Sequence, residues 1–184
     1  MFLYPIAERS VLATLKRTRK NRTGGKIEEE KEKKGNGKEG TQIYCLIIDL
    51  HNREIIGKAC GRRKEAALVE QAFLSIRHPL DRIAIFHTDR GSEFKNECID
   101  RIIKAFDILR SLSRKGCPYD NAVAEATYSI FKAEFAAGSS FSELKELERA
   151  LNDYVLWYNN VRLNGSLGYL SPVAYRQSQN PPVR

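Results

Sequence analysis

The chain has 184 residues, a formal net charge of +8 and 42% hydrophobic residues, a composition that suits one globular domain with a charged extension. No apolar run approaches the roughly 18–20 residues of a membrane span, and residues 1–7 are too short for the apolar core of a signal peptide. The four cysteines, Cys45, Cys60, Cys98 and Cys117, have neither C-x-x-C nor zinc-site spacing. These features exclude an integral membrane protein and a disulfide-stapled secreted protein. They predict a cytoplasmic protein with reduced thiols and no membrane partner.

The first 40 residues differ in kind from the rest. They carry 11 Lys/Arg against 6 Glu, a balance of +5, whereas the other 144 residues (184 − 40) carry 20 against 17, a balance of +3. Residues 24–40 hold a single apolar residue, Ile27, among Lys, Glu and Gly. Low hydrophobicity at high charge density is typical of a flexible segment, and excess cations favour a polyanionic partner. We therefore predict a basic, largely disordered arm over 1–40, with a short helix around residues 8–18, and a compact domain over 41–184.

The compact domain alternates between strand and helix patterns. Short apolar runs bounded by turn residues predict strands at 43–49, 54–60, 82–88 and 108–112. Helical spacing predicts helices at 64–76, 93–106 and 142–158. A further helix is predicted to begin near Asp120 or Asn121, either of which can cap its free N–H groups. This order predicts an α/β layer fold in which helices cover a mixed sheet.

The helix that begins near residue 121 has two faces. One stripe is predicted to face the core, and it consists of Ala124, Thr127, Phe131 and Phe135. A second stripe lies about a quarter-turn away, and it consists of Asn121, Glu125, Tyr128 and Lys132. The second stripe would place a carboxylate and an ammonium group on one partly polar face.

Asp89 and Glu125 are the carboxylates with the clearest indication of chemistry. Asp89 ends the apolar run 83–89, and 35 residues (125 − 89 − 1) separate it from Glu125 on the predicted helix. A carboxylate at a strand end and another on a helix can converge on Mg²⁺, which prefers oxygen ligands. Two such ions clamp the attacking and leaving oxygens in phosphoryl transfer. The pair indicates an enzyme that cuts or joins nucleic-acid backbones, a chemistry that normally needs a third carboxylate.

Five sequence blocks occur in a fixed order along residues 43–176. They are LIIDLHNREIIG at 46–57, FHTDRGSEF at 86–94, SLSRKGCPYDNA at 111–122 followed by Ala124-Glu125, YNNVR at 158–162, and Gly165-Ser166-Leu167 with Ser171-Pro172. Together they resemble the catalytic domain of bacterial insertion-sequence transposases, a class related to retroviral integrases. The resemblance implies a ribonuclease-H-like mixed sheet flanked by helices.

The resemblance also implies an activity and its residues. The family's reaction is Mg²⁺- or Mn²⁺-dependent cleavage and strand transfer at insertion-sequence ends and target DNA, by a homo-oligomer. By this match Asp89 and Glu125 are the second and third members of an Asp-Asp-Glu triad that holds two metal ions. Lys132, seven residues after Glu125, matches a position expected to touch donor DNA. Arg114 and Lys115 could bind phosphates or simply occupy a turn, and the sequence leaves both readings open.

The family's first Asp, on a strand before residues 43–49, has no evident counterpart, because residues 1–42 contain no Asp. Its role could fall to a Glu from the charged segment, namely Glu28, Glu29, Glu30 or Glu32, or to Asp49. The four glutamates lie among few strand-forming residues, and Asp49 stands at a strand-to-turn junction where Asp commonly serves the turn. We therefore expect the first strand to be missing or replaced, with residues 1–6 or 10–15 as its weakly patterned stand-ins.

Two hypotheses follow from this departure. The chain is an impaired transposase catalytic domain from a truncated or frameshifted gene, or it is a non-catalytic remnant that binds DNA or intact transposase. A carboxylate beside Asp89 and Glu125 would separate them. His87 is expected to pack within the strand region, and Trp157 and Tyr158 are expected to belong to the core of the last helix.

Overall fold

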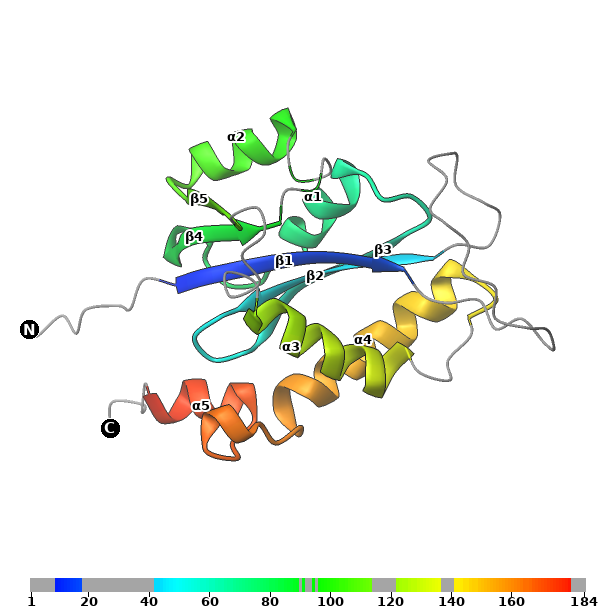
Figure 1. The fold of residues 1–184 in the computed structure, drawn as a ribbon, viewed down its shortest axis with the longest axis vertical. Helices are drawn as coiled ribbons and strands as arrows, with labels where there is room; N and C mark the ends of the chain where they lie inside the picture. Colours follow the sequence, from blue (N-terminus) through cyan, green and yellow to red (C-terminus); the bar gives the residue numbers. More distant parts are fainter. Residues whose placement is uncertain are drawn as a thin grey trace, which may run out of the picture.

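The computed structural model describes residues 9–17, 42–89, 91, 94, 96–113, 122–136 and 141–179. Their centre is a five-stranded sheet in the order β3-β2-β1-β4-β5, with helices on both faces (Figure 1). The strands are β1 (Arg9–Arg17), β2 (Ile43–Asp49), β3 (Ile55–Gly61), β4 (Ile83–Thr88) and β5 (Leu109–Leu112). The α-helices are α1 (Ala66–Leu74), α2 (Glu97–Ala105), α3 (Ala122–Phe131), α4 (Leu144–Asn160) and α5 (Pro172–Gln179).

The central strand β1 shows that the prediction of a helix around residues 8–18 was wrong. β1 runs antiparallel to β2, with Val11 opposite Asp49, and parallel to β4, with Leu12 opposite His87. Each neighbouring strand directs a row of backbone N–H and C=O groups toward β1, and buried groups of this kind must be paired. The free energy gained by pairing these backbone groups outweighs the local helix preference of the Ala, Leu and Lys residues in this segment. The first strand is therefore replaced by residues from the range assigned to the arm; the rest of 1–41 lies outside the described residues.

Two cores lie on opposite faces of the sheet, and β2 contributes to both. Alternate residues of β2 point to opposite faces, as strand geometry requires, and all seven are buried. Ile43, Cys45 and Ile47 join a core with α1 and α2, to which Val11 and Ala13 of β1 also belong. Tyr44, Leu46 and Ile48 join a core with α4 and the end of α3. Figure 1 shows the corresponding layers, with α1 and α2 on one side and α3 and α4 on the other.

The remaining predicted elements of the compact domain are confirmed with small shifts at their ends. The elements that were not predicted include α5 and a π-helical turn, η4 (Lys132–Ala136), that continues α3. Tyr158 is buried as expected, whereas Trp157 is 42% exposed. Adjacent helical residues lie about 100° apart, so these two side chains cannot both face the core. No helix in the described ranges has the length and apolarity needed to cross a membrane.

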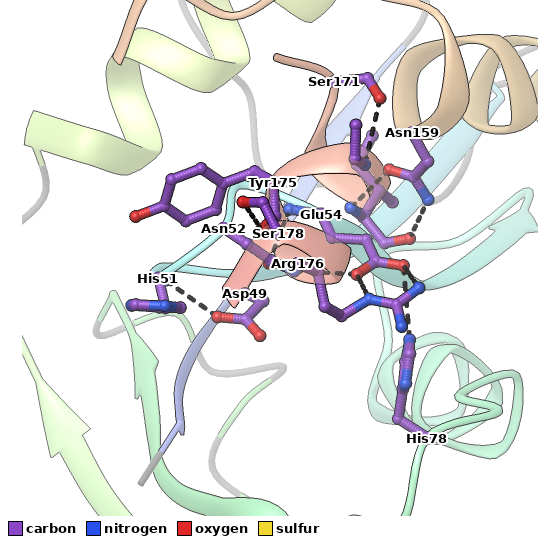
Figure 2. Close-up of polar contacts among 12 residues, drawn as sticks. Asp49, His51, Asn52, Glu54, His78, Asn159, Ser171, Tyr175, Arg176 and Ser178 are labelled. Carbon is purple, nitrogen blue, oxygen red and sulfur yellow. Dashed lines mark hydrogen bonds and ion pairs between the residues drawn. The ribbon is translucent and has the colours of Figure 1, made fainter. Parts of the chain in front are cut away.

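The C-terminal segment is tied to the β2–β3 hairpin by polar contacts (Figure 2). The Asn159 side chain both accepts a hydrogen bond from Ile55 N and donates one to Ile55 O, each at 2.9 Å. Arg176 on α5 donates from Nε to Glu54 Oε2 at 2.9 Å. These contacts hold α4 and α5 against the sheet.

Candidate active site

Asp89 lies directly after the C-terminal end of β4, where its side chain is exposed. Its Oδ1 accepts a hydrogen bond from Gly91 N at 2.8 Å. A short Asp side chain that bonds the backbone two residues on forms a tight local turn. The carboxylate is therefore held at the edge of the sheet.

The two residues before Asp89 are bound to β5. Both ring nitrogens of His87 contact serines, Nδ1 with Ser111 Oγ at 2.9 Å and Nε2 with Ser113 Oγ at 3.0 Å. Thr88 is fully buried, and its carbonyl accepts a hydrogen bond from Ser113 N at 3.1 Å. His87 thus lies within the strand region, in a polar network between β4 and β5.

Glu125 on α3 and Lys132 on η4 are both exposed, so the stripe predicted to be partly polar is open to solvent at these two positions. Thr127, Phe131 and Phe135 are buried on the opposite face. Phe131 packs against Tyr44 of β2 with ring centroids 4.7 Å apart. The stripe pattern therefore predicted correctly which face of this helix is buried. Asn121 and the side chain of Ala124 lie outside the described part.

The π-helical turn that begins with Lys132 is held by an ion pair. Arg162 donates from Nε to Glu134 Oε1 at 2.8 Å, and its second nitrogen lies 2.8 Å from the same oxygen. Tyr154 Oη donates to Glu134 Oε2 at 2.8 Å. Partial burial by itself raises the pKa of Glu134, but these hydrogen bonds outweigh burial and hold the pKa below its ordinary value. The end of the helix is thereby fixed on α4.

Asp49 serves the β2–β3 turn. It is fully buried, and its Oδ1 accepts a hydrogen bond from His51 N at 2.9 Å. It pairs with Val11, whereas Asp89 comes two residues after His87, which pairs with Leu12. The glutamates that could supply the first carboxylate, Glu28, Glu29, Glu30 and Glu32, lie outside the described residues, as do Arg114 and Lys115.

The described residues do not fit a complete three-carboxylate metal site. Among them, no group of three or more His, Cys, Asp or Glu side chains could hold a metal ion. The sequence of β1, RSVLATLKR, contains neither Asp nor Glu. This strand adjoins β4, yet it adds no carboxylate to Asp89 and Glu125.

Comparison with known proteins places the chain in a family. Two family models, each described as "Integrase core domain", match residues 31–118 and 125–179. An uncharacterized transposase-like protein of Haemophilus influenzae is 33% identical over 148 residues, covering 77% of this chain and 67% of that protein. The chain belongs to the integrase-core family of insertion-sequence transposases. This integrase-core chain is also 33% identical over 151 residues to the putative transposase InsK for insertion sequence element IS150 of Escherichia coli. That match covers 78% of the chain and 52% of InsK, so the chain spans about half the length of this relative.

Solved structures of retroviral integrases share the fold of this integrase-core chain. The simian T-cell lymphotropic virus intasome gives a TM-score of 0.69 at 12% identity, covering 96% of this chain and 57% of that one. The HTLV-2 integrase catalytic core in complex with magnesium (trimeric form) gives 0.61 at 13% identity, covering 90% and 94%. The predicted ribonuclease-H-like fold is therefore confirmed.

Of the two stand-ins suggested for the first strand, residues 10–15 are confirmed, because they lie within β1. Sequence reasoning missed one support of the Asp89 region, Arg110 of β5, whose side chain donates to Phe94 O at 3.0 Å. A single Arg on a short strand gives no sequence signal for such a contact.

Proposed function

We propose that this chain is a transposase catalytic domain in impaired form, derived from an enzyme of metal-dependent phosphodiester cleavage and strand transfer at insertion-sequence ends. Asp89 and Glu125 would be its remaining ligands for Mg²⁺ or Mn²⁺. One observation carries the proposal: β1 occupies the strand position between β2 and β4 but contains no carboxylate. Among the described residues, the strand position is filled while β1 adds no carboxylate to Asp89 and Glu125.

The register of β1 indicates where a carboxylate would have to stand. The last parallel pair is Leu12 with His87, and continuing the same register for two residues beyond it would set residue 14 opposite Asp89. In the backbone register position 14 is opposite Leu46 of β2, a residue of the core with α4 and the end of α3. Glu125 lies on α3. This register supports position 14, a Thr in this chain, as the place to introduce an Asp in a test.

A strand-cleavage assay on DNA carrying insertion-sequence ends, with Mg²⁺ or Mn²⁺, tests this proposal. We expect the wild-type chain to show little or no metal-dependent cleavage, and Thr14→Asp to raise it by about 100-fold or more, because a missing ligand costs several kcal/mol of charge stabilisation. Adding Glu125→Gln to Thr14→Asp should abolish the gain. Strong wild-type cleavage that Glu125→Gln removes would contradict impairment and would point to a carboxylate from elsewhere.

The second candidate is a non-catalytic protein that binds DNA or intact transposase. The net charge of +8 and the exposed Lys132 beside the Glu125 face favour DNA. If Lys132 contacts a phosphate, Lys132→Ala should lower the slope of log affinity against log salt by about 1. Lys145→Ala, an exposed lysine on α4, is the matched control and should leave the slope unchanged. DNA binding without cleavage, even in Thr14→Asp, would favour this candidate.

A further inference from the structure

The chain on both sides of Asp89 is bound to β5 and to Ser113, which directly follows this strand. Before Asp89, the His87 imidazole is held at both nitrogens by Ser111 and Ser113, at 2.9 and 3.0 Å. A ring with two hydrogen bonds in opposite directions cannot rotate without losing both of them. Backbone pairing of His87 with Ser111 adds to this connection. The end of β4 is therefore fixed by side chains as well as by the sheet.

After Asp89, the support comes from Arg110. Gly91 N donates to Asp89 Oδ1 at 2.8 Å, and Phe94 N donates to Gly91 O at 3.1 Å. Phe94 is 1% exposed, so its ring anchors this segment in the core. Its carbonyl accepts the Arg110 hydrogen bond at 3.0 Å. A chain of contacts thus runs from Asp89 through Gly91 and Phe94 to β5.

Arg110 also forms an ion pair with Asp100 of α2, with 2.7 Å between Nη1 and Oδ1. The Asp100 side chain is 57% exposed, and an ion pair with one partner so open to solvent contributes little to stability. The bond to the Phe94 carbonyl is different, because a charged donor to a buried backbone acceptor forms a stronger hydrogen bond. Substituting Asp100 removes the ion pair and leaves the hydrogen bond from Arg110 to Phe94 O in place.

We propose that His87 and Arg110 are positioning residues for the Asp89 carboxylate. They bond the chain two residues before and five residues after Asp89 to one segment, β5 and the Ser113 that follows it. Catalytic groups tolerate small misplacements poorly, so support from neighbouring side chains sets how well a site is preorganised. The use of Asp89 as a metal ligand rests on the function proposed above; the hydrogen-bonded support does not.

Nuclear magnetic resonance of the full chain tests the proposal through the Gly91 amide, which bonds Asp89 directly. In His87→Phe and in Arg110→Met we expect a changed Gly91 amide shift and about tenfold faster exchange with water, the loss of one hydrogen bond. Asp100→Asn removes the ion pair alone and should leave Gly91 unchanged. The proposal would be overturned if folded His87→Phe and Arg110→Met kept the wild-type Gly91 amide shift and exchange rate. It would also be overturned if Asp100→Asn changed the Gly91 amide as much as they do.

Milder variants keep the test decisive if these proteins fail to fold. Arg110→Lys retains a cation near Asp100 but lacks the forked donor, and it should still change the Gly91 signal. His87→Gln retains one donor and one acceptor, so its Gly91 signal should lie closer to that of the wild type than the signal of His87→Phe does. A Gly91 signal that is no closer would count against the proposal. Broadening of the Gly91 signal by Mn²⁺, compared with Asp89→Asn, tests the metal role separately. Absence of broadening would contradict metal binding by Asp89 without altering the outcome for His87 and Arg110.

Discussion

The side chain of Asn159 forms hydrogen bonds with the β3 backbone in the way that a residue of a neighbouring strand would. Its amide oxygen accepts from Ile55 N and its amide nitrogen donates to Ile55 O. This is the two-bond pattern of a hydrogen-bonded pair in an antiparallel ladder. The residue therefore satisfies backbone groups at the start of β3 and attaches the end of α4 to them.

Replacing Asn159 by Asp should remove one of these bonds and leave a repulsive contact in its place. A carboxylate can still accept from Ile55 N, but it cannot donate to Ile55 O, which would then face a negative charge. We expect Asn159→Asp to lower the free energy of unfolding at neutral pH by about 1–3 kcal/mol, as measured by denaturant titration. Asn160→Asp is the control, since Asn160 is exposed and its side chain bonds Leu156 O within its own helix. Equal losses in both variants would contradict this role of Asn159.

Glu54 is a nearly buried carboxylate at the start of β3, with three polar partners (Figure 2). Arg176 Nε and Asn52 Nδ2 each donate to Oε2 at 2.9 Å, and His78 Nε2 lies 3.4 Å from Oε1. Burial by itself raises the pKa of Glu54, but the hydrogen bond from His78 and the Arg176 guanidinium outweigh burial and lower the pKa below its ordinary value. The ionised form is therefore the one that stabilises the fold.

The stability contributed by Glu54 should depend on pH in a defined direction. A folded-state pKa below the unfolded value of about 4.3 means that the contribution is complete above that pH and is lost as pH falls through the folded pKa. We expect the difference in unfolding free energy between wild type and Glu54→Gln to be about 1–3 kcal/mol at pH 7 and to shrink below about pH 4. Glu148→Gln, an exposed carboxylate on α4, serves as control. A difference that grows on acidification would refute the assignment.

At the scale of elements, α1 packs on β3 so closely that one position has no room for a side chain. A Cβ built on Gly57 would lie 2.6 Å from the Ala72 carbonyl oxygen of α1 and 3.2 Å from Ile47 Cβ of β2. The first neighbour is backbone and cannot move without shifting the helix. The distance between α1 and the sheet is therefore set by a glycine.

Gly57→Ala should force α1 away from β3. Overpacking of this kind costs about 1–3 kcal/mol, which a lowered thermal midpoint of unfolding would report. Gly165→Ala is the matched control, because no atom lies within 4 Å of a Cβ at that position, and surface changes are usually within about 0.5 kcal/mol. If Gly57→Ala unfolded at the same thermal midpoint as the wild type, α1 would be able to move away from β3 without loss of stability, which would contradict this prediction.

The success of sequence-based prediction also varied by element. β2 was predicted at its observed bounds because its seven buried residues form an unbroken apolar run. The two faces of α3 were predicted because Glu125 and Phe131 follow helical spacing. β1 was predicted only as one of two weakly patterned alternatives, residues 10–15, beside a competing helix over 8–18, since the decisive factor is the row of backbone groups on β2 and β4, and β4 begins more than 60 residues later in the chain. His87 and Arg110 acquire their partners only when β5 is placed beside β4.

At the scale of the whole molecule, fold and chemistry depend on different parts of the same strand. β1 contributes backbone pairing to β2 and β4 and buries Val11 and Ala13, and these contributions need no carboxylate. The family's activity, as the resemblance implies it, needs a carboxylate there. The sequence blocks therefore predicted the fold and the family, which do not depend on a carboxylate in β1.

The central place of β1 also has a consequence for the order in which the protein is made. β1 is synthesised before its neighbours, yet its parallel partner β4 is complete only at Thr88, 71 residues (88 − 17) after the end of β1. At ordinary translation rates this takes roughly 4–14 s. During that interval β1 and β2 can form at most one side of the final sheet, with an unpaired edge facing solvent or a chaperone. Nascent-chain stability should therefore rise sharply only when the ribosome has released β4.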